Sequence, residues 1–115
     1  MSAFVISKRF NATYKFAFTS KKGKTIFTSS GYELKFECEA AIENLRANID
    51  NCTYIKQKAS NGKYFFKILL EGQEVAISRK YASLLRLEIG IDEVVRFAST
   101  AEVLDFTIND FTFFE

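Results

Sequence analysis

The second half of this chain repeats the first half. When the sequence is shifted by 50 residues, Phe4 falls on Tyr54 and Tyr14 falls on Tyr64. After one residue is dropped in a turn the shift becomes 49, and the matched pairs then include Ser29 and Ser78, Gly23 and Gly72, Tyr32 and Tyr81, Ile42 and Ile91, and Leu45 and Val94. A repeated unit of this size usually cannot bury its apolar face alone. We therefore expect the two copies to fold around one shared core.

Length and composition are those of a single domain. The chain has 115 residues, of which 48% are hydrophobic, and its 13 Phe and 5 Tyr are enough for a core. The repeat predicts a first unit at residues 1–50, a second at 51–99, and a C-terminal strand with an aromatic tail at 100–115. The formal net charge is only +2, which argues against a dedicated polyanion binder.

Each unit begins with segments that alternate between apolar and polar residues. In the second of these segments, Tyr14, Phe16 and Phe18 occupy alternate positions, which is the pattern of a half-buried strand. On this pattern we predict strands at residues 3–9, 13–20 and 25–29 in the first unit, and near 53–59, 63–70 and 74–78 in the second. Between two of them, Asn61-Gly62 is a favoured hairpin turn.

Both units then change to helical spacing. Apolar residues recur at every third or fourth position from Leu34, which predicts a helix at residues 34–48. A second helix is predicted at about 84–98, with Ser83 as its N-cap. Residues 103–108 alternate like a further strand. The predicted fold is a single α+β domain of tandem β-β-β-α repeats with pseudo-two-fold symmetry, in which the helices lie on one side of an antiparallel sheet.

Four short motifs occur in the same order in each unit. They are Tyr14-Lys15-Phe16, Lys22-Gly23-Lys24, Thr28-Ser29-Ser30-Gly31-Tyr32 and Ala41-Ile42-Glu43-Asn44-Leu45 in the first, and Asn61-Gly62-Lys63-Tyr64-Phe65-Phe66, Glu71-Gly72-Gln73, Ser78-Arg79-Lys80-Tyr81 and Gly90-Ile91-Asp92-Glu93-Val94 in the second. In order, spacing and duplication they resemble the YegP-like family of small bacterial and archaeal proteins. The resemblance covers residues 3 to about 107.

This resemblance implies an α+β domain whose two units share a sheet and exchange their terminal strands. It brings no catalytic residues, because the biochemical activity of the family is uncharacterised. The chain departs from the family pattern before each hairpin glycine, where Lys22 and Glu71 replace Asn. It departs again at the helix starts, where Leu34-Lys35 and Ser83-Leu84 stand in place of Ser-Lys. Residues 111–115 have no counterpart in the family pattern.

The residue inventory argues against an enzyme. The chain has no His, which removes imidazole general bases and most zinc sites. Glycine-rich phosphate loops are also absent from the sequence. Cys38 and Cys52 are expected to be free thiols, and Cys38 falls on the apolar stripe of its helix, where packing explains it. We expect no catalytic, cofactor-binding or metal-binding residues.

The most site-like feature is the repeated Ser-x-x-Tyr motif, at Ser29 and Tyr32 and again at Ser78 and Tyr81. In a structural interpretation, each Ser ends a strand and each Tyr ring wedges between sheet and helix. In a functional interpretation, the two clusters form a ligand pocket at the junction of the repeats.

A second candidate site combines lysines with an aromatic ring. Outward-facing Lys15, Lys63 and Lys67, together with Phe65, would place charge and one ring on a sheet face, as single-stranded nucleic-acid binders do. The alternative is ordinary strand lysines that keep the sheet soluble and blunt its edges.

The third candidate is the aromatic tail, which contains Phe111, Phe113 and Phe114. Exposed, it would be an aggregation liability or a strand that binds a partner. Docked within the chain or in a dimer, it would cover a sheet edge or a dimer seam.

From these observations we expect a non-enzymatic cytoplasmic module. It would bind an unknown protein partner through its sheet face, a sheet edge or the Phe-rich tail. The alternative is a nucleic-acid-binding module that uses the Lys/aromatic face. The protein is expected to fold as a monomer or a weak homodimer, to need no cofactor and to have no membrane segment, since no apolar run is long enough to span a bilayer.

Overall fold

A computed structural model of the chain describes residues 2–107. Its elements are β1 (Ala3–Lys8), β2 (Tyr14–Thr19), β3 (Thr25–Ser29), α1 (Lys35–Ala47), the 3-10 turn η1 (Ile49–Asn51), β4 (Thr53–Lys58), β5 (Tyr64–Leu70), β6 (Gln73–Ser78), α2 (Leu84–Phe97), the 3-10 turn η2 (Ala98–Thr100) and β7 (Glu102–Asp105). The expected strands and helices are all present, with ends that differ by one or two residues in most cases.

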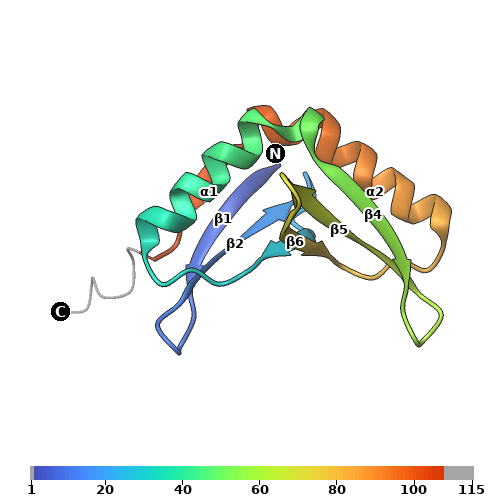
Figure 1. The fold of residues 1–115 in the computed structure, drawn as a ribbon, viewed down its shortest axis with the longest axis horizontal. Helices are drawn as coiled ribbons and strands as arrows, with labels where there is room; N and C mark the ends of the chain where they lie inside the picture. The colour runs from blue at the N-terminus through green and yellow to red at the C-terminus, as the bar shows by residue number, and fades with distance from the viewer. Residues whose placement is uncertain (1, 108–115) are drawn as a thin grey trace.

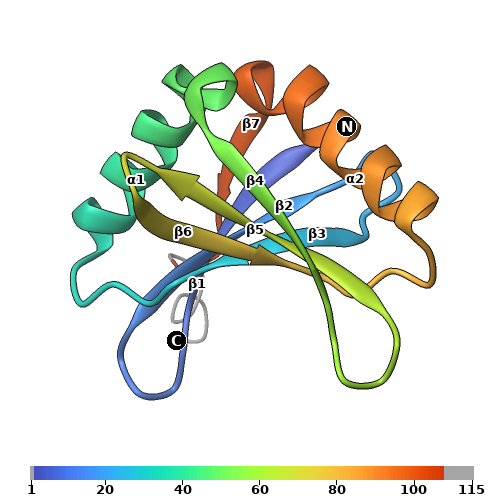
Figure 2. The same cartoon turned by 45° about the vertical axis from the view of Figure 1, so that its right-hand side comes forward.

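The seven strands form one sheet in the order β4-β5-β6-β3-β2-β1-β7. Figures 1 and 2 show the sheet bent like a roof, with both helices on its upper side and the hairpins β1–β2 and β4–β5 pointing away from them. At the centre, β3 and β6 pair antiparallel, with Phe27 opposite Ser78 and Ser29 opposite Ala76. The first three strands and the second three are thus joined directly by backbone hydrogen bonds.

The expectation of an antiparallel sheet was wrong for one strand. β7 runs parallel to β1, with Ala3 opposite Glu102 and Ile6 opposite Asp105, so the sheet is mixed. The physical reason is the path of the chain, because α2 and η2 return it to the end of the sheet at which β1 begins. The last described strand therefore follows the second helix in sequence but pairs with the first strand.

The core lies between the sheet and the two helices. On the β1–β2–β3 side it is largely aromatic, with Phe4, Phe18 and Phe27 completely buried and ring centroids 5.1 Å apart for Phe4 and Phe18. On the β4–β5–β6 side the fully buried side chains include Phe66 and Leu87. The alternation in β2 is confirmed, because Phe16 and Phe18 are buried whereas Lys15, Ala17 and Thr19 beside them are only partly buried. No helix within residues 2–107 has the length and apolar character needed to cross a bilayer.

Candidate functional site

Both serines of the Ser-x-x-Tyr motifs complete the hydrogen bonding of the sheet. Ser29 Oγ accepts a hydrogen bond from the Phe16 amide at 3.0 Å and donates one to the Ser30 carbonyl at 2.8 Å. Ser78 Oγ accepts from the Phe66 amide at 2.9 Å and donates to the Arg79 carbonyl at 2.7 Å. Both side chains are buried. These hydrogen bonds to the backbone already engage both hydroxyl groups.

The two tyrosines lie in short antiparallel bridges next to these serines. Tyr32 exchanges backbone hydrogen bonds with Tyr14, and Tyr81 exchanges them with Tyr64. The Tyr81 ring packs directly on α2 at Gly90, where a Cβ would overlap the phenol. Burial raises the pKa of Tyr81, although the neighbouring Arg79 acts to lower it. Both the Tyr32 and the Tyr81 phenol have a pKa raised mainly by burial, so both are neutral at pH 7 and can donate a hydrogen bond.

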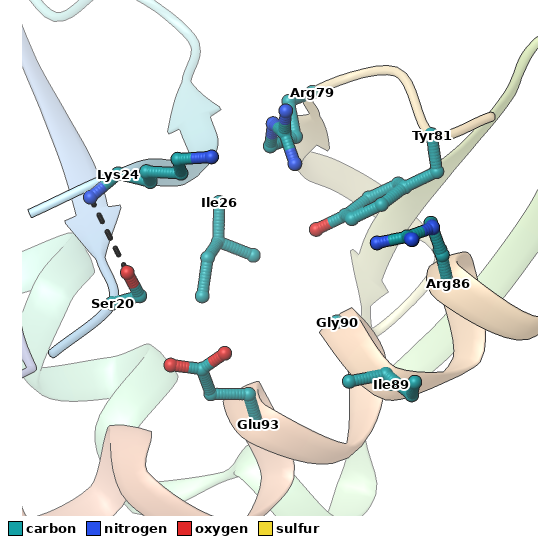
Figure 3. Close-up of a pocket in the computed structure, with 9 residues that line it drawn as sticks. All are labelled: Ser20, Lys24, Ile26, Arg79, Tyr81, Arg86, Ile89, Gly90 and Glu93. Carbon is teal, nitrogen blue, oxygen red and sulfur yellow. Dashed lines mark hydrogen bonds between the residues drawn. The ribbon is translucent and has the colours of Figure 1, made fainter. Parts of the chain in front are cut away.

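Each tyrosine lines a cavity between a helix and a hairpin from the other half of the chain. The α2 cavity has a volume of about 170 Å³ and lies between α2, Tyr81 and the β2–β3 hairpin (Figure 3). Its lining residues are Ser20, Lys24, Ile26, Arg79, Tyr81, Arg86, Ile89, Gly90 and Glu93. The α1 cavity has a volume of about 230 Å³ and is lined by Tyr32, Ala41, Asn44, Leu70, Glu71, Gln73 and Val75. The structure therefore brings both tyrosines to cavities between the two halves. Ser29 lines a further cavity of about 190 Å³ where β3 meets β6, together with Lys15, Thr28, Ser30, Glu74, Ala76 and Ile77.

A groove runs along the outer edge of the sheet between β4 and α2. This β4–α2 groove is lined by Lys56, Glu88, Ile91, Asp92 and Val95 and has a volume of about 290 Å³. An ion pair between Lys56 Nζ and Glu88 Oε2, 2.8 Å long, links the strand to the helix. The apolar part of the groove is open to solvent, since Val95 is 39% exposed and Ile91 is only half-buried. Sequence reasoning missed this groove.

The residues of the predicted Lys/aromatic face lie at two separate strands of the sheet. Lys15 is on β2 and Phe65 and Lys67 are on β5, and β3 and β6 lie between these two strands. Lys67 Nζ is 3.5 Å from Glu74 Oε1, while Lys63 precedes β5 at the hairpin turn. The Phe65 ring has the Lys80 ammonium 5.7 Å from its centroid. Nucleic-acid binding at this face stays a prediction.

The remaining candidates are the aromatic tail and the thiols. Phe111, Phe113 and Phe114 lie outside the described residues. Cys38 and Cys52 are free, as expected. Desolvation of the buried Cys38 raises the pKa of its thiol to about 11. Among residues 2–107 no three His, Cys, Asp or Glu side chains are grouped closely enough to hold a metal ion.

Comparison with proteins of known sequence identifies the family. No protein-family model matches the chain. The UPF0339 protein YegP of Escherichia coli K12 is 31% identical over 106 residues, which cover 90% of this chain and 96% of the relative. The chain belongs to the UPF0339 (YegP) family. The UPF0339 protein in the ptx operon 5' region of Stutzerimonas stutzeri is 30% identical over 94 residues and covers 80% and 85% of the two chains.

Two solved members of the YegP family have the same fold. The NMR structure of E. coli YegP, described as a protein of unknown function, matches with a TM-score of 0.82 at 30% identity and covers 92% of this chain and 93% of that one. The NMR structure of a UPF0339 protein from Shewanella oneidensis matches with a TM-score of 0.85 at 26% identity and covers 99% and 98%. None of these YegP-family names states an enzymatic activity.

The sequence held a signal for the β4–α2 groove but none for the α2 cavity. Ile91 and Val95 are four positions apart on α2, and a second apolar stripe beside a polar edge strand is the signature of an uncovered groove. Lys24 is far in sequence from Arg79 and Arg86, and the pairing of β3 with β6 brings it to them. In this YegP-family protein the positive charge of the α2 cavity therefore becomes apparent only in the folded structure.

Proposed function

We propose that this YegP-family protein is a non-enzymatic binding module that captures an extended, acidic segment of a partner protein. The segment adds to the outer edge of β4 as a parallel strand and lies in the β4–α2 groove. Such β-augmentation obtains affinity from main-chain hydrogen bonds and specificity from the alternate side chains. The observation that carries the proposal is that, among residues 2–107, the corresponding edge of β1 is covered by β7 whereas no strand pairs with the outer edge of β4.

In this proposal the two halves are tandem repeats related by a pseudo-two-fold axis between β3 and β6. The pairing registers support this relation, since Ala3 faces Thr19 in β1–β2 and Thr53 faces Leu69 in β4–β5. Both inner hairpins shift register at matching places, after Phe18 and after Ile68. The repeated serine hydrogen bonds described above are a further point of agreement.

Under this relation β7 serves as a template strand: its pairing with β1 indicates how a partner segment would pair with β4. It pairs with β1 over four residues, and its Asp105 forms an ion pair with Lys35 of α1. Ile42 of α1, in the half that β7 covers, is only 1% exposed. Its counterpart Ile91, in the half that no strand of residues 2–107 covers in this way, is half-buried and lines the groove. A strand in the groove would bury this apolar surface in the same way.

The charge of the edge indicates the kind of partner. The β4 strand carries Lys56 and Lys58, while the template strand β7 carries Glu102 and Asp105. Lysines on an exposed edge strand also discourage that edge from pairing with apolar strands of other molecules. An acidic segment with alternating apolar residues suits this edge. Lys56 already pairs with Glu88, but Lys58 forms no ion pair within residues 2–107 and can be compensated by a carboxylate of the segment, whose apolar residues fill the groove.

The chemistry of the thiols supports a binding role. Because the pKa of Cys38 is raised to about 11, its nucleophilic thiolate is scarce at neutral pH. Burial also raises the pKa of Cys52. Two free thiols suit a protein of the reducing cytoplasm.

The experiment uses the template strand as a probe. The ¹⁵N-labelled protein is titrated with a synthetic peptide that has the sequence of residues 101–107, and amide shifts are mapped by NMR. We expect saturable shifts in β4 and along the groove side of α2. Val95→Lys should abolish them, whereas Leu85→Lys, which adds the same charge at an exposed position outside the groove, should not.

Three results would reject the proposal. Shifts confined to β1 and α1 would mean that the peptide only displaces β7. No saturable shift at millimolar peptide would mean that the β4 edge is closed to added strands. Concentration-dependent dimers that bury β4 against β4, seen by size-exclusion chromatography and NMR, would assign the edge to a second copy of this chain.

A further inference from the structure

The α2 cavity gathers three basic side chains against one acidic side chain. Lys24 reaches it from the β2–β3 hairpin, Arg79 from the end of β6 and Arg86 from the first turn of α2, while Glu93 is the single carboxylate. Within residues 2–107 none of the three cations forms an ion pair. Figure 3 shows the Tyr81 oxygen pointing into the cavity from between the two arginines.

The matching α1 cavity shows that the fold does not require this charge. By the shift of 49, Lys24 corresponds to Gln73, Arg79 to Ser30 and Arg86 to Glu37. Both cavities keep a tyrosine and a small helix residue, Gly90 in one and Ala41 in the other. The basic side chains are therefore a property of one cavity and are not needed to pack the junction.

We propose that the α2 cavity binds a small organic phosphate. Arginine presents paired N–H donors in the geometry of phosphate oxygens, and two arginines with one lysine match a dianion. The neutral Tyr81 phenol adds a donor on the same side. This site lies on a different side of α2 from the β4–α2 groove and stands without the proposed partner strand.

The other walls define the non-phosphate part of the ligand. Glu93 accepts hydrogen bonds, and the Ser20 hydroxyl, which accepts from the amides of Lys22 and Lys24, retains its own proton for donation. Ile26 and Ile89 provide apolar surface. The volume of about 170 Å³ equals roughly six water molecules, which suits a phosphate ester of a short hydroxylated chain.

The test uses glycerol 3-phosphate as the probe, with glycerol and inorganic phosphate as the other arms. In NMR titrations we expect saturable shifts at the amides of residues 79–81 and 86–90, and none at Tyr32 or Ala41. Glycerol should have no effect, and inorganic phosphate should bind more weakly than the ester. Added salt should weaken the binding of glycerol 3-phosphate, since the attraction between its phosphate and the basic side chains is mainly electrostatic.

Substitution by the residues of the other cavity provides matched variants. Arg79→Ser, Arg86→Glu and Lys24→Gln should each weaken binding, the two arginine variants by about tenfold or more. Arg96→Ser, at an exposed arginine outside the cavity, should leave it unchanged. All four positions are exposed, and a dispersed spectrum verifies folding of each variant. The absence of saturable shifts, equal shifts at the α1 cavity, or equal affinity for inorganic phosphate and the ester would each overturn the proposal.

Discussion

Gly90 lies directly under the phenol ring of Tyr81, at a distance that leaves no room for a Cβ. Glycine inside a helix costs about 1 kcal/mol relative to alanine, so this position is an exception that needs a cause. The cause is the close approach of the tyrosine, which brings its ring onto the backbone of α2. Tyr81 is consequently the better buried of the two motif tyrosines.

The first prediction concerns this contact. Gly90→Ala should destabilise the protein by about 1–3 kcal/mol, because overpacking outweighs the gain in helix propensity. In a Tyr81→Ala background the same substitution should instead stabilise the fold by about 1 kcal/mol, because the obstruction is gone. Urea unfolding of the four proteins in this cycle measures both values. An effect of the same sign in both backgrounds would contradict the prediction.

The second prediction concerns the serine at the end of β6. Ser78→Ala leaves the buried amide of Phe66 without its acceptor, so we expect a loss of about 1–3 kcal/mol in the free energy of unfolding. Ser29→Ala should have a similar effect through the amide of Phe16. Ser99→Ala, at an exposed position, should change stability by less than about 0.5 kcal/mol. If Ser78→Ala unfolds at the wild-type urea concentration, the hydroxyl has no structural role.

The third prediction concerns the turn between β5 and β6. Glu71 has a φ of 55°, in the left-handed region that favours glycine and asparagine. Glu71→Asn should therefore stabilise the protein by about 0.5–1 kcal/mol. Lys22→Asn is the matched control, because Lys22 holds the equivalent place in the β2–β3 turn and its φ is not positive. Thermal and urea unfolding should separate the two variants, and equal effects would show that the backbone conformation is not the cause.

The fourth prediction concerns the acidic end of β7. Burial acts to raise the pKa of Asp105, but hydrogen bonds from Lys35 and Thr107 outweigh it and hold the pKa below its usual value. A carboxyl with a lowered pKa contributes stability above its unfolded pKa of about 3.9 and loses that contribution as the pH falls through the folded value. The stability difference between wild type and Asp105→Asn should thus be largest near neutral pH.

This difference should shrink as the pH falls below about 4. Urea unfolding of both proteins from pH 7 to pH 2 measures it, with Glu102→Gln as a control at an exposed position of the same strand. A pH-independent difference would show that the charge of Asp105 does not hold β7.

Local patterns in the sequence predicted most of the elements, because each depends on neighbouring residues. The alternation of Phe16 and Phe18, for example, marks β2 whatever lies beside it. The direction of β7 was not predictable in this way, since it depends on where α2 returns the chain. The spread of the Lys/aromatic residues over two strands was not predictable either, because it depends on β3 and β6 pairing between the strands of Lys15 and Lys67.

The expectation of two equivalent halves did not point to the candidate sites, because these sites lie where the two halves differ. Lys24 and Gln73 occupy matching positions, and only the first contributes positive charge to its cavity. The open edge of β4 is likewise visible only once β7 has been located on β1.

The pairing of β7 with β1 has a consequence for biosynthesis. Within this sequence β1 is the first strand to be translated and β7 the last. The outer edge of β1 therefore has no β7 to pair with until nearly the whole described sequence has been synthesised. Both helices and the other six strands of the described sheet precede β7 in the sequence, so this border is the last part of that sheet to close.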